Sequence, residues 1–203
     1  MTWVLLCGLL VFAFAASITP GPNNMLLLAS GANFGLRRSL PHMLGVILGF
    51  GAMVLLVGWS LAGVILTAPW VYQLIRWGGG AYLLYLAFKI ATARGIGGGE
   101  GRSRPMTFWQ AVAFQWVNPK GWAMALGAEA TYATRDHLFS NIVLIALVFT
   151  LVGAPCVGGW TVFGVVMKRL LNRPAALRAF NLGMAALLVA SLFPLVTEPM
   201  GHA

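Results

Sequence analysis

Six long apolar runs, separated by short polar stretches, constrain the fold of this 203-residue chain more than any other feature. A helix needs about 20 apolar residues to cross a bilayer, and each run reaches that length. An open chain inside lipid must satisfy its backbone hydrogen bonds within each segment, which leaves helices as the solution. We therefore predict an all-α integral membrane protein with six transmembrane helices. The predicted segments are 3–28, 44–66, 70–93, 108–132, 142–167 and 177–196.

The low share of charged residues argues against a soluble fold. Charged residues make up 8% of the chain, whereas a soluble domain carries about 25%. We therefore expect a single membrane domain over residues 1–203 in contact with the lipid bilayer. The formal net charge is +9, but the basic residues stand singly or in pairs between apolar runs and form no continuous basic face. Because nucleic-acid binding needs such a face, we predict no nucleic-acid partner.

The basic residues also predict an orientation in the membrane. Ten Lys and Arg residues lie in or beside the first, third and fifth connections, and only Arg76 and Arg135 lie on the opposite side. Under the positive-inside rule, the odd connections are cytoplasmic and both termini lie outside. The Gly-rich connection 94–107 then separates half 1–93 from half 108–203. Each half has three predicted helices, so the second half enters the membrane in the opposite sense, which predicts two inverted three-helix repeats.

Two of the predicted helices are interrupted by polar residues, proline and glycine. The first interruption covers residues 17–24 and the second covers residues 115–121, so each falls in the first helix of its half. Proline in a helix interior costs about 3 kcal/mol or more, because it removes a donor and clashes with the preceding turn. Asn118-Pro119 also resembles a new helix start, with Asn as N-cap and Pro in the first turn. We therefore predict that helices one and four are broken.

A helix that restarts inside the membrane directs unpaired N–H groups into the interior, where the carboxylate of a small zwitterion could bind. Of the Lys and Arg residues, only Lys120 lies well inside a predicted span, and intramembrane charges are functional candidates. Two simpler readings stand beside this one: the prolines are ordinary kinks, and Lys120 snorkels or pairs with Glu129. The predicted substrate-binding residues are Thr19, Pro20, Gly21, Pro22, Asn23, Asn24, Gln115, Asn118, Pro119 and Lys120.

Glu129 is the acidic residue that falls within a predicted span, toward its outer end. If transport is coupled to proton entry, Glu129 is the candidate for the coupling residue, and the alternative is a carboxylate solvated at a helix end. The pairs Gly45-x-x-x-Gly49 and Gly158-Gly159 predict close helix packing. No residue spacing indicates a metal site, a cofactor or a catalytic pair, so we predict no enzyme.

The stretch Thr19-Pro20-Gly21-Pro22-Asn23-Asn24 resembles the lysine-exporter family of bacterial efflux proteins, called LysE/RhtB. The resemblance continues at Gly35-Leu36-Arg37-Arg38, in residues 76–83 and at Asn118-Pro119-Lys120, and so covers nearly the whole chain. The resemblance implies six helices in the bacterial inner membrane and proton-driven export of amino acids or their derivatives. With the charge rule above, it places both termini in the periplasm.

Within that family, the stretches 88–92, 108–109 and 114–118 are most similar to exporters of cysteine and O-acetylserine. The chain departs from the family at two places. The family pattern Gly-x-Arg-x-Gly has Gly at its last position, where this chain has Ser39, and the stretch Glu129-Ala130-Thr131-Tyr132 also differs from the family. The departures leave the amino-acid substrate and the coupling residue open. A metal or other cation exporter is the alternative function, and the sequence leaves open whether the chain forms a homo-oligomer.

Overall fold

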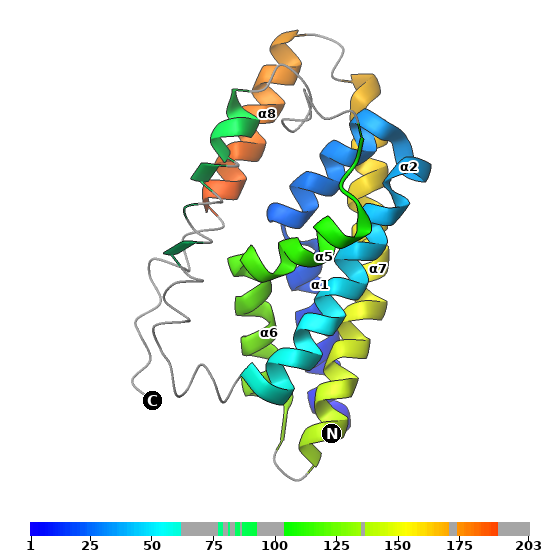
Figure 1. Cartoon of the computed structure of the whole chain (residues 1–203), viewed down its shortest axis with the longest axis vertical. Coiled ribbons are helices and arrows are strands. Elements are labelled where there is room, and N and C mark those ends of the chain that lie inside the picture. The colour runs from blue at the N-terminus through cyan, green and yellow to red at the C-terminus, as the bar shows by residue number, and fades with distance from the viewer. Residues whose placement is uncertain are drawn as a thin grey trace.

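Every element in the described part of this computed structural model is a helix, as the sequence predicts (Figure 1). The structure describes residues 1–61, 77–78, 81, 84–85, 87–92, 104–134, 137–170 and 174–190. Most of the third predicted segment, most of the connection 94–107 and the end of the sixth segment lie outside these residues. The elements are α1 (Trp3–Ile18), α2 (Pro22–Leu56), the π-helical turn η1 (Val57–Leu61), α5 (Phe108–Val117), α6 (Pro119–Tyr132), α7 (Leu138–Leu170) and α8 (Pro174–Ala190).

Helix α2 consists of two arms that meet at Gly35. This residue has φ 79° and ψ 170°, a left-handed backbone conformation that a side chain disfavours. The chain reverses there, and Figure 1 shows the first arm in blue rising to the turn and the second in cyan descending from it. The Ser30 and Ser39 hydroxyl oxygens lie 2.9 Å apart across the turn. The first arm thus extends the first predicted segment, and the second arm is the second segment.

The span lengths differ from the predicted ones. Within the described ranges, two helical segments are long and apolar enough to cross a membrane: Pro22–Trp59, whose two arms meet at Gly35, and Leu138–Lys168, with 31 residues. Helix α1 is apolar but has only 16 residues, because the first break ends it. The connection expected at 29–43 is helical apart from Gly35, because the arms of α2 continue into it. The count of six spans and the inverted repeat stay predictions.

Close backbone contact holds the long helices together. Helices α2 and α7 share the most extensive interface of the described chain. A Cβ atom at Gly31 would collide with the carbonyl oxygen of Thr161, and one at Gly164 would collide with that of Leu28. Since a methyl group would separate the backbones, these glycines permit an approach that no other residue allows.

The two glycine pairs singled out in the sequence have different outcomes. A Cβ atom at Gly49 would lie 2.9 Å from the Val112 Cα, so the second arm of α2 does pack closely on α5. No described atom lies within 4 Å of a Cβ built at Gly158 or Gly159. The packing role predicted for that pair finds no partner among the described residues and stays a prediction.

The outer surface of the helices carries large apolar side chains. Trp3 is 81% exposed, Trp109 is 74% exposed and Leu151 is 71% exposed. Extensive exposure of this kind is unfavourable in water but favourable against lipid tails. The buried interior, by contrast, contains polar side chains such as Asn24 and Gln115. The protein thus exposes large apolar groups and buries several polar side chains within an otherwise apolar interior, which fits a membrane setting.

Candidate functional site

The first break lies between α1 and α2, and donors from three elements satisfy the end of α1. Helix α1 ends at Ile18, Gly21 is the N-cap of α2 and Pro22 occupies its first turn. The last carbonyl groups of a helix have no partner within it. Here Asn24 Nδ2 donates to the carbonyl oxygens of Ser17 (2.9 Å) and Thr19 (2.8 Å).

A tryptophan of α7 and a lysine of α6 complete this set of donors. Trp160 Nε1 donates to the Ile18 carbonyl at 3.2 Å. Lys120 Nζ donates to the carbonyl oxygens of Thr19 (2.7 Å) and Pro20 (3.4 Å). A cation at a helix C-terminus also interacts favourably with the helix dipole. The broken end is therefore stabilised by side chains that lie far away in sequence.

The second break is narrower and consists of one residue between α5 and α6. Helix α5 ends at Val117, and Asn118 is the N-cap of α6 with Pro119 directly after it. The Asn118 side-chain oxygen accepts from the Lys120 N–H at 3.2 Å, as an N-cap should. The helix start predicted from Asn118-Pro119 is thus present.

The two breaks lie against one another, although nearly 100 residues separate them. Asn23 Nδ2 donates to Gln115 Oε1 at 2.8 Å, and Gln115 Nε2 donates back to Asn23 Oδ1 at 3.2 Å. Gln115 is fully buried and also donates to the Ala111 carbonyl at 2.8 Å. Together with the bonds from Lys120 to Thr19 and Pro20, this amide pair joins half 1–93 to half 108–203 at the breaks.

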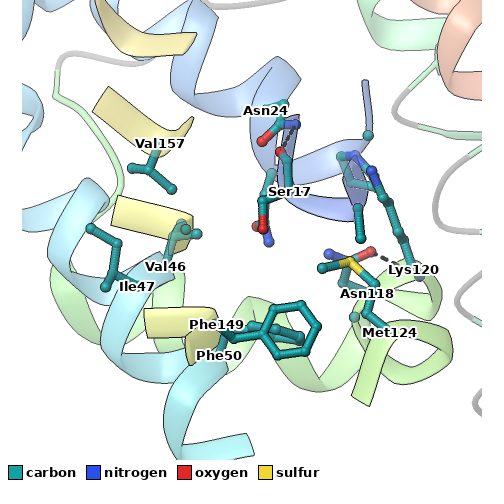
Figure 2. Close-up of a pocket in the computed structure, with 16 residues that line it drawn as sticks. Ser17, Asn24, Val46, Ile47, Phe50, Asn118, Lys120, Met124, Phe149 and Val157 are labelled. Carbon is teal, nitrogen blue, oxygen red and sulfur yellow. Dashed lines mark hydrogen bonds between the residues drawn. The ribbon is translucent and has the colours of Figure 1, made fainter. Parts of the chain in front are cut away.

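A cavity of about 60 Å³ lies beside the joined breaks. A site for one water molecule needs about 10–15 Å³ on this measure, so the cavity has room for several water molecules or a small polar group. Figure 2 shows Lys120 and Asn118 on one side of the cavity and Val46, Ile47 and Val157 on the other. The cavity thus has a polar end, where the helices break, and an apolar end, where α2 meets α7.

The backbone around the polar end offers N–H groups. Gly21 provides no side-chain cap for α2, and Pro22 has no N–H. No described residue accepts a hydrogen bond from the backbone N–H of Asn23, Asn24 or Gly121. All three of these residues line the cavity. Two helix N-termini therefore present unpaired donors beside the Lys120 side chain, which is a favourable setting for an anion.

The structure places the ten predicted substrate-binding residues unequally. Six of them line the cavity: Gly21, Pro22, Asn23, Asn24, Asn118 and Lys120. The other four do not line the cavity but support the breaks. Thr19 and Pro20 accept hydrogen bonds from Lys120 through their carbonyl groups. Gln115 pairs with Asn23, and Pro119 lies in the first turn of α6.

Sequence reasoning missed the remaining residues that line the cavity. Most are apolar residues or glycines, which look like any other residue of a membrane helix. Ser17 lies within the first interruption, so its polar side chain was a signal that could have been used. The missed residues are Ala16, Ser17, Val46, Ile47, Phe50, Gly121, Met124, Phe149, Gly153 and Val157.

Glu129 lies outside this cavity, on α6 and against the π-helical turn η1. A Cβ atom at Gly58 would lie 2.9 Å from both Cδ and Oε1 of Glu129. Among the described residues, neither carboxyl oxygen has a hydrogen-bond partner. The structure does not pair Glu129 with Lys120, whose Nζ bonds instead to the end of α1. Short π-helical segments occur often at functional sites, and this one contacts an intramembrane carboxyl group.

Comparison with known proteins identifies the family. Residues 14–197 match the family model of the LysE type translocators. Cysteine/O-acetylserine efflux proteins of Shigella flexneri and Escherichia coli (strain K12) are 30% identical to this chain over 190 residues, which cover 93% of the chain and 96% of each relative. No solved structure shows a significant match. Because the family match spans most of the chain and its members are transporters, this chain belongs to the LysE type translocators and is a membrane transport protein, not an enzyme.

Proposed function

We propose that this protein exports small neutral amino acids, of the size of cysteine and O-acetylserine, from the bacterial cytoplasm. The observation that carries the proposal is the junction of the two breaks beside one cavity. In transporters with broken helices, the half-helix ends bind the charged groups of the substrate near the middle of the membrane. The relatives named cysteine/O-acetylserine efflux proteins support this substrate class.

The carboxylate of the amino acid binds at the polar end of the cavity. Lys120 supplies a positive charge there, and the N–H groups of Asn23, Asn24 and Gly121 supply donors. The Asn118 side-chain nitrogen has no partner among the described residues and lines the same space. Charge-assisted hydrogen bonds of this type are about twice as strong as neutral ones, so they fix the orientation of the substrate.

The substrate ammonium group lies toward the end of α1. The C-terminus of a helix carries a partial negative charge, which attracts a cation. The Ser17 hydroxyl group and the Asn23 side-chain oxygen both belong to residues that line the cavity near this end. Among the described residues, no Asp or Glu side chain lines the cavity. A substrate with a second positive charge on its side chain would therefore be unpaired, so the site favours neutral side chains.

Proton entry drives export, and Glu129 is the coupling residue of this proposal. A carboxyl group can take up and release one proton, and intramembrane carboxyl groups serve this role in many transporters. Glu129 and Lys120 are nine positions apart on α6, about 13 Å along a helix axis. The proton site and the amino-acid site are thus separate, and α6 connects them.

A growth challenge tests the proposed function. Cells that lack their own amino-acid exporters are grown with inhibitory concentrations of cysteine, O-acetylserine, lysine or arginine, with and without this protein. We expect expression to restore growth on cysteine and O-acetylserine but not on the two cationic amino acids. Protection against lysine and arginine alone would contradict the proposal.

The same strains test the alternative from the sequence, a metal or other cation exporter. Within the described ranges, no three His, Cys, Asp or Glu side chains lie close enough together to hold a metal ion. No observation therefore favours the alternative over amino-acid export. Tolerance of zinc, nickel or cobalt salts without any amino-acid phenotype would instead favour a metal exporter over an amino-acid exporter.

A further inference from the structure

We propose that Gly153 of α7 sets the upper limit on the size of the substrate side chain. The inference rests on the proposed function, because it assumes that the cavity beside the breaks binds an amino acid. Gly153 lies one turn after Phe149 and one turn before Val157 on the same helix, and all three residues line the cavity. Its missing side chain therefore leaves space on the α7 side of the cavity, opposite the Ser17 hydroxyl group.

The polarity of the cavity orients a bound amino acid toward this glycine. Lys120 and Asn118 occupy one side of the cavity, and Val46 and Val157 occupy the opposite side (Figure 2). An amino acid whose carboxylate binds at the polar side must extend its side chain toward α7. The side chain then enters the space in front of Gly153.

The steric setting of Gly153 differs from that of the packing glycines on the same helix. A Cβ atom at Gly164 would collide with the backbone of α2, so that position must be glycine for packing. A Cβ atom at Gly153 would meet only the Ser17 Oγ among described atoms, at 3.9 Å, which is ordinary van der Waals contact. Packing against the described helices therefore does not require glycine at this position. A larger residue there would fill the cavity and would leave the fold intact.

The volume shows why one methyl group matters. The cavity measures about 60 Å³, and a group of the size of a water molecule takes about 10–15 Å³ of it. An alanine at position 153 removes about one such group, and a valine removes more. In an apolar pocket, one methylene group changes discrimination between substrates by about 10-fold or more. Transport of O-acetylserine, which has the longer side chain, should therefore be lost before transport of cysteine.

The experiment measures transport of cysteine and O-acetylserine in proteoliposomes that contain wild-type protein, Gly153→Ala or Gly153→Val. We expect the ratio of O-acetylserine to cysteine transport to fall about 10-fold in Gly153→Ala and further in Gly153→Val. Gly159→Val is the matched control, because Gly159 is an exposed glycine of the same helix, away from the cavity. It should leave the ratio unchanged.

Val157→Ala enlarges the same end of the cavity and should shift the ratio in the opposite direction. Size-exclusion chromatography checks that each variant folds, and Gly153→Ala carries the test if the valine variant does not. An unchanged ratio in Gly153→Ala and Val157→Ala would overturn the inference. Failure of the wild-type protein to transport either amino acid would instead overturn the proposed function, so the two failures are distinguishable.

Discussion

At the level of single residues, the proposed site gives Lys120 two roles. It bonds the carbonyl groups of Thr19 and Pro20 across the two breaks, and its side chain lines the cavity. The same ammonium group can therefore hold the halves together and attract the substrate carboxylate. A substrate that binds in the cavity competes with the end of α1 for Lys120, which links occupancy of the site to the contact between the halves.

Substitution of Lys120 by Met tests this double role. Hydrogen bonds to a charged group contribute about 1.5–3 kcal/mol, so we expect Lys120→Met to lower the transport rate about 10-fold to 100-fold. Lys168→Met is the control, because Lys168 is an exposed lysine at the far end of α7. The measurement is the initial rate of cysteine transport in proteoliposomes. A variant with the wild-type rate would remove Lys120 from the site.

Glu129 gives a second prediction for a single residue, because its carboxyl group is the proposed proton site. Glutamine has almost the same shape but cannot release a proton. We expect Glu129→Gln to abolish net transport driven by a pH gradient and to retain exchange of labelled for unlabelled amino acid. Glu129→Asp keeps a carboxyl group and should restore part of the gradient response. Full gradient-driven transport by Glu129→Gln would exclude this residue from coupling.

The polar residues of the site were predictable from the sequence, and its apolar wall was not. Pro22, Asn23 and Asn118 stand out because proline and asparagine are unusual in an apolar segment. Phe149 and Gly153 carry no such signal, since phenylalanine and glycine are common in membrane helices. Their place at the cavity depends on how α7 crosses α2, which the sequence pattern does not specify.

At the level of elements, the two breaks are built in different ways. The first has Gly21 as an N-cap without a side-chain hydrogen bond, and the second has Asn118 as an N-cap that bonds the Lys120 N–H. Each restarted helix carries proline in its first turn. At each break, residues whose backbone N–H groups lack an acceptor in the described chain line the cavity, and the proline, which has no N–H, favours a restart there.

A continuous helix at the first break should eliminate transport. Replacement of Pro20, Gly21 and Pro22 by alanines removes the residues that interrupt the helix, and alanine is the best helix former. We expect transport to fall below detection, because the donors at the start of α2 would bond within the helix instead. Pro41→Ala is the control, since Pro41 lies inside α2, does not line the cavity and is exposed. Retained transport in the triple variant would contradict the site assignment.

The elements themselves were predictable, but their exact ends were not. Apolar length indicated the helices, and proline with asparagine indicated both breaks. The continuation of α2 through the expected first connection escaped prediction, because residues 29–43 contain charges and polar groups that normally indicate a loop. There a single glycine with positive φ makes the turn, and the hydrogen bond between Ser30 and Ser39 stabilises it.

At the level of the whole molecule, the arrangement of basic residues predicts how the chain lies in the membrane. The odd connections carry most of the Lys and Arg residues, so they should face the cytoplasm. We expect alkaline phosphatase fused after Ala203 to be active in the periplasm, and the same enzyme inserted within 94–107 to be inactive. Green fluorescent protein at the same positions is the complementary control. Fluorescence after Ala203 would show the opposite orientation.

The sequence predicted the class of the molecule more securely than the relation between its halves. Apolar length alone indicates membrane helices, whereas an inverted repeat depends on how six spans are placed. The similar construction of α1 and α5 supports the repeat: Thr2 caps the first helix and Thr107 caps the second, and each helix ends at a break. The third predicted span lies mostly outside the described residues, so the repeat stays a prediction.

The reciprocal bond between Asn23 and Gln115 has a consequence for the history of the family. Each amide supplies both a donor and an acceptor to the other, and loss of Asn23 would leave the side-chain oxygen of the fully buried Gln115 unsatisfied. Selection should therefore act on the two positions as a unit. Across the homologues of this chain, we expect the two positions to covary, with an apolar residue at one accompanied by an apolar residue at the other.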